Sequence, residues 1–203
     1  MYVIEVHLSL GNRNYKYECV NMTSAELIDL LKSGDNISLI AMHIGAHPEL
    51  VETLMSITLK DGPDSSWRTA WTADKIHEHH PELIVPYLPS MIDFAVRTLN
   101  SGKKRHLLKL ISLHDIPDEK MALLLNHCIQ VFSDATEAIA VRVHAMQILF
   151  RIAEKEPGFT GELIGLIEHE IEFHGSAGIA SRGRKLLKKL CAMEKSGFEH
   201  SLE

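Results

Sequence analysis

Several features are scarce in this sequence, and each scarcity counts against a class of protein. Only three of its 203 residues are cysteines, Cys19, Cys128 and Cys191, and no CxxC pair occurs. Neither a disulfide framework nor a thiolate zinc site is therefore expected, and a reducing, cytoplasmic setting fits best. No stretch approaches the roughly 18 consecutive apolar residues of a membrane-spanning helix, so we expect no membrane segment.

Basic charge is also in short supply, since the formal net charge is -6. The whole molecule would not attract phosphate, and binding to nucleic acid would need a locally basic face. The first residues lack a basic region followed by a long apolar run, so no signal peptide is expected. What remains, 45% hydrophobic and 24% charged residues, is typical of a soluble chain that folds into one or two domains.

Residues 1–21 differ from the rest of the chain. The stretches YVIEVHLSL and YKYECV are rich in β-branched and aromatic residues and flank the turn cluster GNRN. This pattern predicts a short N-terminal β-hairpin or arm. Because a two-stranded hairpin alone is marginal in water, it should pack on the helices or pair with a second copy, which would give a homodimer.

From residue 22 onward the pattern is helical. Apolar residues recur three and four positions apart, and glycine, proline and asparagine interrupt them at short intervals. We predict about ten helices with short connectors, which form one domain over 22–193. A tail over 194–203 follows, and its last two residues, Leu202 and Glu203, could come from cloning.

Internal similarity indicates how these helices are arranged. The tetrapeptide HPEL occurs at 47–50 and at 80–83, and Arg68, Arg105 and Arg142 are separated by 37 and again by 37 residues. The segments WRTAWTADKI, KRHLLKLISL and VRVHAMQILF align around these arginines. The preceding helices align as well, with apolar triplets such as Met91, Cys128 and Ile167. Such a period with two helices per unit is typical of helical repeats.

These motifs also carry a resemblance. The openings DGPDSSWRTAW and SDATEAIAVRVHA resemble a HEAT repeat, and the run 22–190 is similar to a family of small bacterial HEAT/ARM-like proteins. The resemblance implies an all-α, right-handed α-α superhelix of four to five helix pairs, a HEAT/ARM-like solenoid preceded by the hairpin. It also implies that the arginine-bearing helices line the concave side.

The candidate partner-binding residues follow from this arrangement: Trp67, Arg68, Trp71, Arg105, Arg142 and Arg182. A row of guanidinium groups could bind an anionic partner through charge-assisted hydrogen bonds. The alternative is structural, because an arginine at the start of a helix often pairs with an acid in the adjoining turn. Asp61, Asp64 and Asp134 lie near in sequence.

The two tryptophans allow different roles. Trp71 fits a packing position between repeats, and Trp67 is the better candidate for an exposed aromatic side chain. A further resemblance is to HEAT-like DNA glycosylases of alkylation repair, which hold a damaged nucleotide with Trp, Asp and Arg. Trp71, Asp74 and Arg105 could imitate that set, although their spacing matches no verified motif.

Other candidate sites are weaker. His77, Glu78 and His80 could hold a divalent ion, but proline follows and histidines at a helix end are favoured by the helix dipole. The stretch GIASRGRK (178–185) has the glycines of a phosphate-binding loop but lacks its Lys-Ser/Thr and a preceding strand. We therefore expect no metal site, no cofactor and no catalytic residues.

The sequence thus predicts a non-catalytic interaction scaffold that binds a protein or peptide, acidic in character, on the concave face of a helical-repeat solenoid. The alternative is a DNA-binding or alkylation-repair glycosylase relative. Residues 22–64 hold seven acids against two lysines, whereas Lys103, Lys104, Arg182 and Arg184 add basic charge further along, which indicates one acidic and one basic end.

Overall fold

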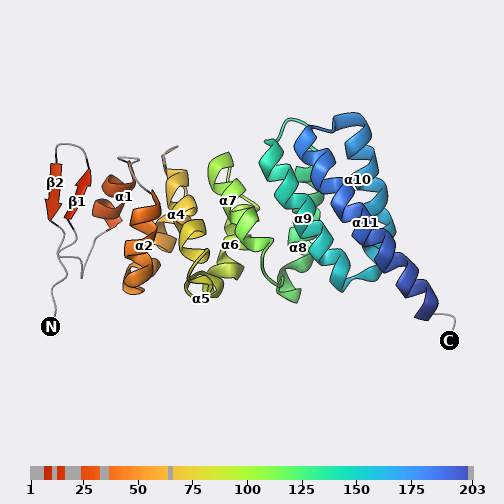
Figure 1. Ribbon diagram of the computed structural model, residues 1–203, viewed down its shortest axis with the longest axis horizontal. Helices are drawn as coiled ribbons and strands as arrows, with labels where there is room; N and C mark the ends of the chain where they lie inside the picture. Colours follow the sequence, from red (N-terminus) through yellow and green to blue (C-terminus); the bar gives the residue numbers. More distant parts are fainter. Residues whose placement is uncertain (1–6, 11–12, 17–23, 33–36, 64–65, 201–203) are drawn as a thin grey trace. The chain divides into compact units, whose positions relative to one another are not determined.

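A computed structural model describes residues 7–10, 13–16, 24–32, 37–63 and 66–200 of the chain (Figure 1). Strand β1 (His7–Leu10) pairs antiparallel with β2 (Arg13–Lys16), and Leu10 lies opposite Arg13. The rest of the segment 1–21, for which the sequence predicts a hairpin or arm, lies outside the described residues. All other described elements are helices.

The helices belong to two compact units, Met1–Pro86 and Tyr87–Glu203. Those of the first unit are α1 (Ser24–Lys32), α2 (Ile37–Ala46), α3 (Glu49–Thr58), α4 (Trp67–His77) and the short α5 (Pro81–Ile84). Those of the second are α6 (Leu88–Ala95), α7 (Ser101–Ile111), α8 (Asp118–Ser133), α9 (Ile139–Lys155), α10 (Thr160–His174) and α11 (Ala177–His200). Single 3-10 turns, η2 (Val85–Tyr87) and η3 (Pro157–Phe159), precede α6 and α10.

In the first unit, alternate helices stack on each other. Helix α1 contacts α3, and α2 contacts α4, while α3 also packs on α4. The side chains between them are apolar and buried, among them Leu27, Ile44, Leu54 and Ala73. A helix pair this small cannot bury its own apolar face, and contact with the next pair supplies the missing cover.

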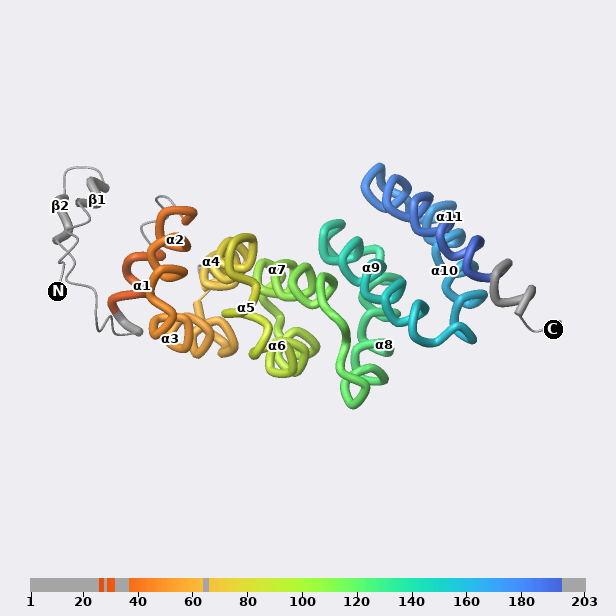
Figure 2. The backbone as a smooth tube through the Cα atoms, turned by 60° about the horizontal axis from the view of Figure 1, so that its bottom comes forward, coloured from red at the N-terminus to blue at the C-terminus, as the bar shows by residue number. Residues whose placement is uncertain are grey.

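The second unit repeats this arrangement. Helix α6 packs on α7, α8 on α9 and α10 on α11, and the second helices of the pairs stack as α7, α9 and α11. Figure 2 shows α9 beside α8, and α11 beside α10. Met91, Cys128 and Ile167, which the sequence places at equivalent positions of α6, α8 and α10, are all fully buried.

Polar contacts between repeats recur at nearly the same sequence separation. Arg68 Nη1 donates to the carbonyl oxygen of Leu31, 37 residues earlier, over 3.4 Å. Arg151 Nε donates to the carbonyl of Ser112 over 3.3 Å, and Lys155 Nζ to that of Ile116 over 2.8 Å, both across 39 residues. Leu31 and Ser112 lie at helix ends, where carbonyls lack intrahelical partners. Cations of one repeat therefore complete the hydrogen bonding of the repeat before it.

One glycine lies where α10 ends, and another lies where α11 packs closely on α10. A side chain on Gly175, just after α10, would collide with the carbonyl oxygen of Ile171. A Cβ atom on Gly183 would lie 2.8 Å from Ile171 Cδ1 and 3.0 Å from Ile167 Cγ2. Gly183 lies inside α11, so GIASRGRK is helical and does not form a phosphate-binding loop. In the described part of the chain, no helix combines the length and apolar character needed to cross a bilayer.

Candidate partner-binding surface

The aromatic candidates lie together at the start of α4. The rings of Trp67 and Trp71, one helical turn apart, stack with centroids 5.5 Å apart and planes inclined by 16°. The Arg68 guanidinium lies 5.8 Å from the Trp67 ring centroid. All three side chains are half-buried, so the division into one packing and one exposed tryptophan does not hold. The trio presents part of a flat aromatic surface with a cation beside it.

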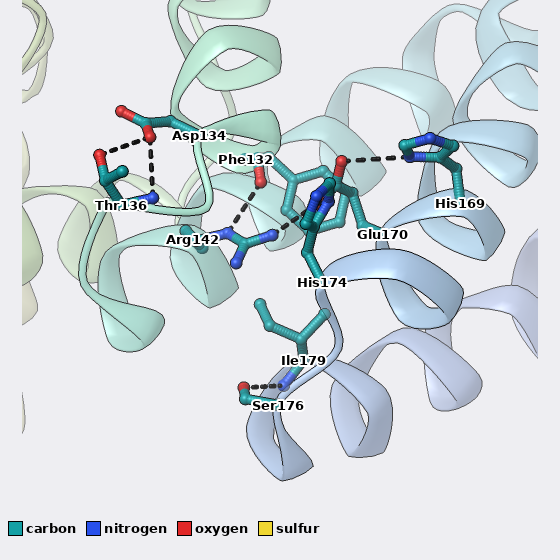
Figure 3. Close-up of polar contacts among 9 residues, drawn as sticks. All are labelled: Phe132, Asp134, Thr136, Arg142, His169, Glu170, His174, Ser176 and Ile179. Carbon is teal, nitrogen blue, oxygen red and sulfur yellow. Dashed lines mark hydrogen bonds and ion pairs between the residues drawn. The ribbon is translucent and has the colours of Figure 1, made fainter.

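Arg142 has a different environment from the other candidate arginines. It is buried on α9, and its Nη2 atom lies 2.6 Å from Glu170 Oε2 of α10. Its Nε atom donates to the Phe132 carbonyl at the end of α8 over 2.9 Å (Figure 3). Arg142 therefore links three helices and is not available to a partner. It has the structural role that the sequence left open, but with Glu170 as the acid instead of Asp134.

Asp134 closes the connection between α8 and α9. Its Oδ1 atom accepts hydrogen bonds from the Thr136 hydroxyl at 2.6 Å and the Thr136 backbone N–H at 2.9 Å. These bonds lower the pKa of Asp134, and the nearby charges of Arg142 and Lys104 act in the same direction. Lys104 Nζ lies 2.6 Å from Glu137 Oε2 in the same connection, which ties α7 to the next helix pair.

Arg105 and Arg182 are exposed, unlike Arg142. Arg105 lies on α7, where its Nη2 atom is 3.0 Å from His106 Nε2. Arg182 lies on α11 and donates from Nη1 to Gln147 Oε1 of α9 over 3.3 Å. Side chains four residues apart share a helix face, so Lys109 continues the strip begun by Arg105, and Arg151 continues that of Gln147.

We call the cations on these strips the basic face; four of them are exposed, and Lys109 and Arg151 are half-buried. Its members are Arg105 and Lys109 of α7, Arg151 of α9, and Arg182, Lys185 and Lys189 of α11. Contacts inside the unit hold the strips together: Arg151 bonds to the end of α7, and Lys189 Nζ lies 5.5 Å from the centroid of the Phe150 ring. The stacking of α7, α9 and α11 thus gathers positive charge from residues 84 positions apart, from Arg105 to Lys189.

Charge is segregated between the two helices of the last pair. The sequence of α10 contains four glutamates and no lysine or arginine, whereas α11 carries five cations between residues 182 and 189: Arg182, Arg184, Lys185, Lys188 and Lys189. The net charge of -6 therefore conceals a locally basic surface. A local field of this kind attracts an anionic partner even when the whole protein is acidic.

The remaining candidates from the sequence have the following environments. Glu78 is bound at both carboxylate oxygens by Lys75 Nζ, at 2.9 Å each, and this hydrogen bonding raises the pKa of Lys75. His80 Nδ1 lies 3.3 Å from Glu82 Oε1. In the set that resembles a DNA glycosylase, Trp71 and the buried Asp74 lie on α4 of the first unit, and Arg105 lies in the second.

One cluster was missed by the sequence analysis. His169, Glu170 and His174, in the last turns of α10, bring their ligand atoms within 4.8 Å of one another. Their spacing matches no metal motif. The signal in the sequence was a glutamate, flanked by two histidines, at a position of α10 that faces the core and would normally be apolar.

Comparison with known proteins identifies the architecture. The family model described as a HEAT repeat domain matches residues 25–190, well over half of the chain. No curated protein and no solved structure matches the chain. The match covers both helical units, and the stacked helix pairs agree with it. The chain therefore belongs to the HEAT repeat domain family.

Proposed function

We propose that this protein is a non-catalytic interaction scaffold that binds an acidic protein or peptide segment through its basic face. HEAT repeats form helical scaffolds that generally mediate protein interactions, in agreement with the family match. The observation that carries the proposal is the stack of α7, α9 and α11, which presents cations from three helices on one supported surface. On this proposal the pairs follow a right-handed superhelical course, and the second helices line its concave side.

The chemistry of the surface favours carboxylates as the ligands. Arg105 and Arg182 are exposed, and a guanidinium group can bind a carboxylate through two parallel hydrogen bonds. Lysines at 109, 185 and 189 add charge without fixed geometry. Trp67, Arg68 and Trp71 of the first unit offer a second patch, where a stacked indole pair could contact an aromatic or aliphatic side chain of the partner.

A direct test measures binding of a fluorescein-labelled peptide rich in Asp and Glu by fluorescence anisotropy, with the full chain. The variant Arg182→Glu/Lys185→Glu should bind at least about tenfold more weakly, because a charge-assisted hydrogen bond contributes roughly 1.5–3 kcal/mol. The matched control is Arg184→Glu/Lys188→Glu, which makes the same charge change on the same helix but on a different face. Equal effects of the two variants would mean that the basic face is not the binding site.

The alternative function, DNA binding, is tested in parallel by titrating the protein with a labelled DNA duplex at several salt concentrations. Contacts with phosphates would give an affinity that falls steeply with salt. Strong binding of the duplex together with no binding of the acidic peptide would contradict the proposal and favour a DNA-binding protein.

The proposal includes a reducing, cytoplasmic setting and a homodimer. The small number of cysteines and the lack of a CxxC pair support such a setting. A two-stranded sheet such as β1–β2 has only edge strands, which can pair with a second copy. Light scattering should give a dimer mass for the natural chain and a monomer mass for Asn14→Pro. In the register that pairs Leu10 with Arg13, the N–H of Asn14 faces the outer edge of β2, and proline removes this donor. A monomer mass for both would exclude this dimer.

A further inference from the structure

The C-terminal turns of α10 place three metal-ligating groups around one point. His169 Nδ1 lies 3.4 Å from Glu170 Oε1, and His174 Nδ1 lies 3.2 Å from Glu170 Oε2 (Figure 3). Both imidazole rings thus turn the same nitrogen toward one carboxylate. Metal–nitrogen and metal–oxygen distances of about 2.0–2.2 Å place two ligand atoms of a tetrahedral ion roughly 3.3–3.5 Å apart. Both nitrogen–oxygen distances, each to a different oxygen of Glu170, are close to that separation, and all three groups offer ligand atoms within 4.8 Å of one another.

The three groups differ in exposure in a way that suits an ion. The Glu170 side chain is 2% exposed, whereas those of His169 and His174 are 56% and 40% exposed. A buried carboxylate supplies a fixed anchor, and the partly exposed imidazoles leave a path for the ion and for water. Two imidazoles and one carboxylate form the protein ligand set of several open zinc sites.

Arg142 supports the carboxylate from the interior side. Its Nη2 atom is 2.6 Å from Glu170 Oε2, and its Nε atom is held by the Phe132 carbonyl. Carboxylates that bind metals are commonly fixed by a hydrogen bond of this kind from a second residue. The positive charge of Arg142 opposes an incoming cation. We therefore expect moderate affinity.

We propose that His169, Glu170 and His174 bind a divalent transition-metal ion of the zinc class, with water completing the coordination. The two imidazole nitrogens and a Glu170 oxygen are the ligands, and Arg142 is a positioning residue. Bound metal would fix the last turn of α10 against the end of α8 and the start of α9. This inference does not depend on the proposed partner binding.

The test is isothermal titration of the full chain with Zn²⁺, together with Co²⁺ absorption to report the ligand geometry. The natural chain should bind one ion at this site. His169→Gln and His174→Gln should each weaken binding at least about tenfold, since loss of a ligand costs more than loss of its hydrogen-bonding partner, which costs roughly 10–100-fold. Both histidines are partly exposed, so these variants should retain the fold, as circular dichroism can verify.

The matched control removes two exposed histidines elsewhere, in His79→Gln/His80→Gln, and should bind Zn²⁺ like the natural chain. A second readout is thermal unfolding. Zn²⁺ at about 100 times its Kd should stabilise the natural chain and the control but neither His169→Gln nor His174→Gln. The proposal is overturned if Zn²⁺ does not bind, or if the variants at 169 and 174 bind it as tightly as the control does.

Discussion

Arg142 and Glu170 form an ion pair in the interior of the second unit, with nitrogen and oxygen 2.6 Å apart and side chains only 4% and 2% exposed. The pair joins α9 to α10, and the second bond of Arg142 to the Phe132 carbonyl adds the end of α8. Neither charge could be buried alone, because removal from water is unfavourable unless a partner compensates. The pair therefore fixes the relative positions of three helices.

Removing one member of the pair should be strongly destabilising. Arg142→Met leaves Glu170 buried without its cation and should lower the free energy of unfolding by about 3–5 kcal/mol. Urea denaturation followed by circular dichroism measures this change. The exposed Arg182 is the comparison, since Arg182→Met should change stability by about 0.5 kcal/mol or less. Similar losses in both variants would show that burial of the pair does not matter.

The contact between α10 and α11 leaves little room for a side chain at Gly183. Gly183→Val would force its methyl groups against Ile171 and Ile167 and should cost about 1–3 kcal/mol. Gly165 lies in the same pair of helices, on α10, and has open space where a Cβ would be. Gly165→Ala should instead stabilise the protein by roughly 0.5–1 kcal/mol, because alanine favours a helix. Chemical denaturation of both variants tests the opposite signs.

Acid sensitivity should come in part from His127. Burial lowers the pKa of His127, and the charge of Lys104 lowers it further, while Glu137 acts in the opposite direction. The native state then binds fewer protons than the unfolded state in the interval between the lowered pKa and about 6.5. The contribution of neutral His127 to the free energy of unfolding is fully present above this interval and is lost as the pH falls through it.

His127→Gln removes this titration, so the variant should lose less stability than the natural protein between about pH 7 and pH 5. Urea unfolding at a series of pH values gives the slope of the free energy of unfolding against pH for each protein. His43 has a pKa lowered mainly by burial and contributes with the same sign, so the loss should shrink without vanishing. An unchanged slope in His127→Gln would contradict this explanation.

The two cysteines that the structure describes should differ in reactivity. Cys128 is buried in α8, and burial raises the pKa of its thiol, whereas Cys191 is exposed on α11. Because the thiolate is the reactive form, iodoacetamide should label Cys191 quickly in the native protein and Cys128 only after unfolding. Mass spectrometry of the digested protein distinguishes the two sites. Rapid labelling of native Cys128 would mean that α8 does not pack as described.

Much of the repeat architecture was predictable from local patterns. Apolar spacing and breakers indicate the helices, and the equivalence of Met91, Cys128 and Ile167 is visible because core positions must recur when similar pairs stack. The hydrogen bond from Arg68 to Leu31, 37 residues apart, likewise follows from the stacking of similar helix pairs.

The environments of the arginines were not predictable in this way. Arg68, Arg105 and Arg142 are evenly spaced, yet they are half-buried, exposed and buried, respectively. The buried cation of α7 is Lys103, two positions before Arg105. It lies 5.4 Å from the centroid of the Phe94 ring, much as Arg142 lies 6.0 Å from that of Phe132. Small shifts in where a helix begins rotate its residues, so equal spacing does not guarantee equal burial.

The partner of Arg142 was also beyond the sequence. Sequence proximity favours acids such as Asp134, but Glu170 lies 28 positions away and reaches Arg142 only because α10 packs on α9. The cluster of His169 and His174 was not predictable for the same reason. Both histidines face the carboxylate of Glu170, which Arg142 holds from the interior.

The proposed binding surface is tested most directly by hydroxyl-radical footprinting of the full chain with and without the acidic peptide. We expect the peptide to protect side chains beside the basic face, such as Leu113 after α7 and His144 of α9. The exposed Leu123 of α8 and Phe173 of α10 should react as before. Protection confined to α8 and α10, or no protection at saturating peptide, would contradict a scaffold that binds through α7, α9 and α11.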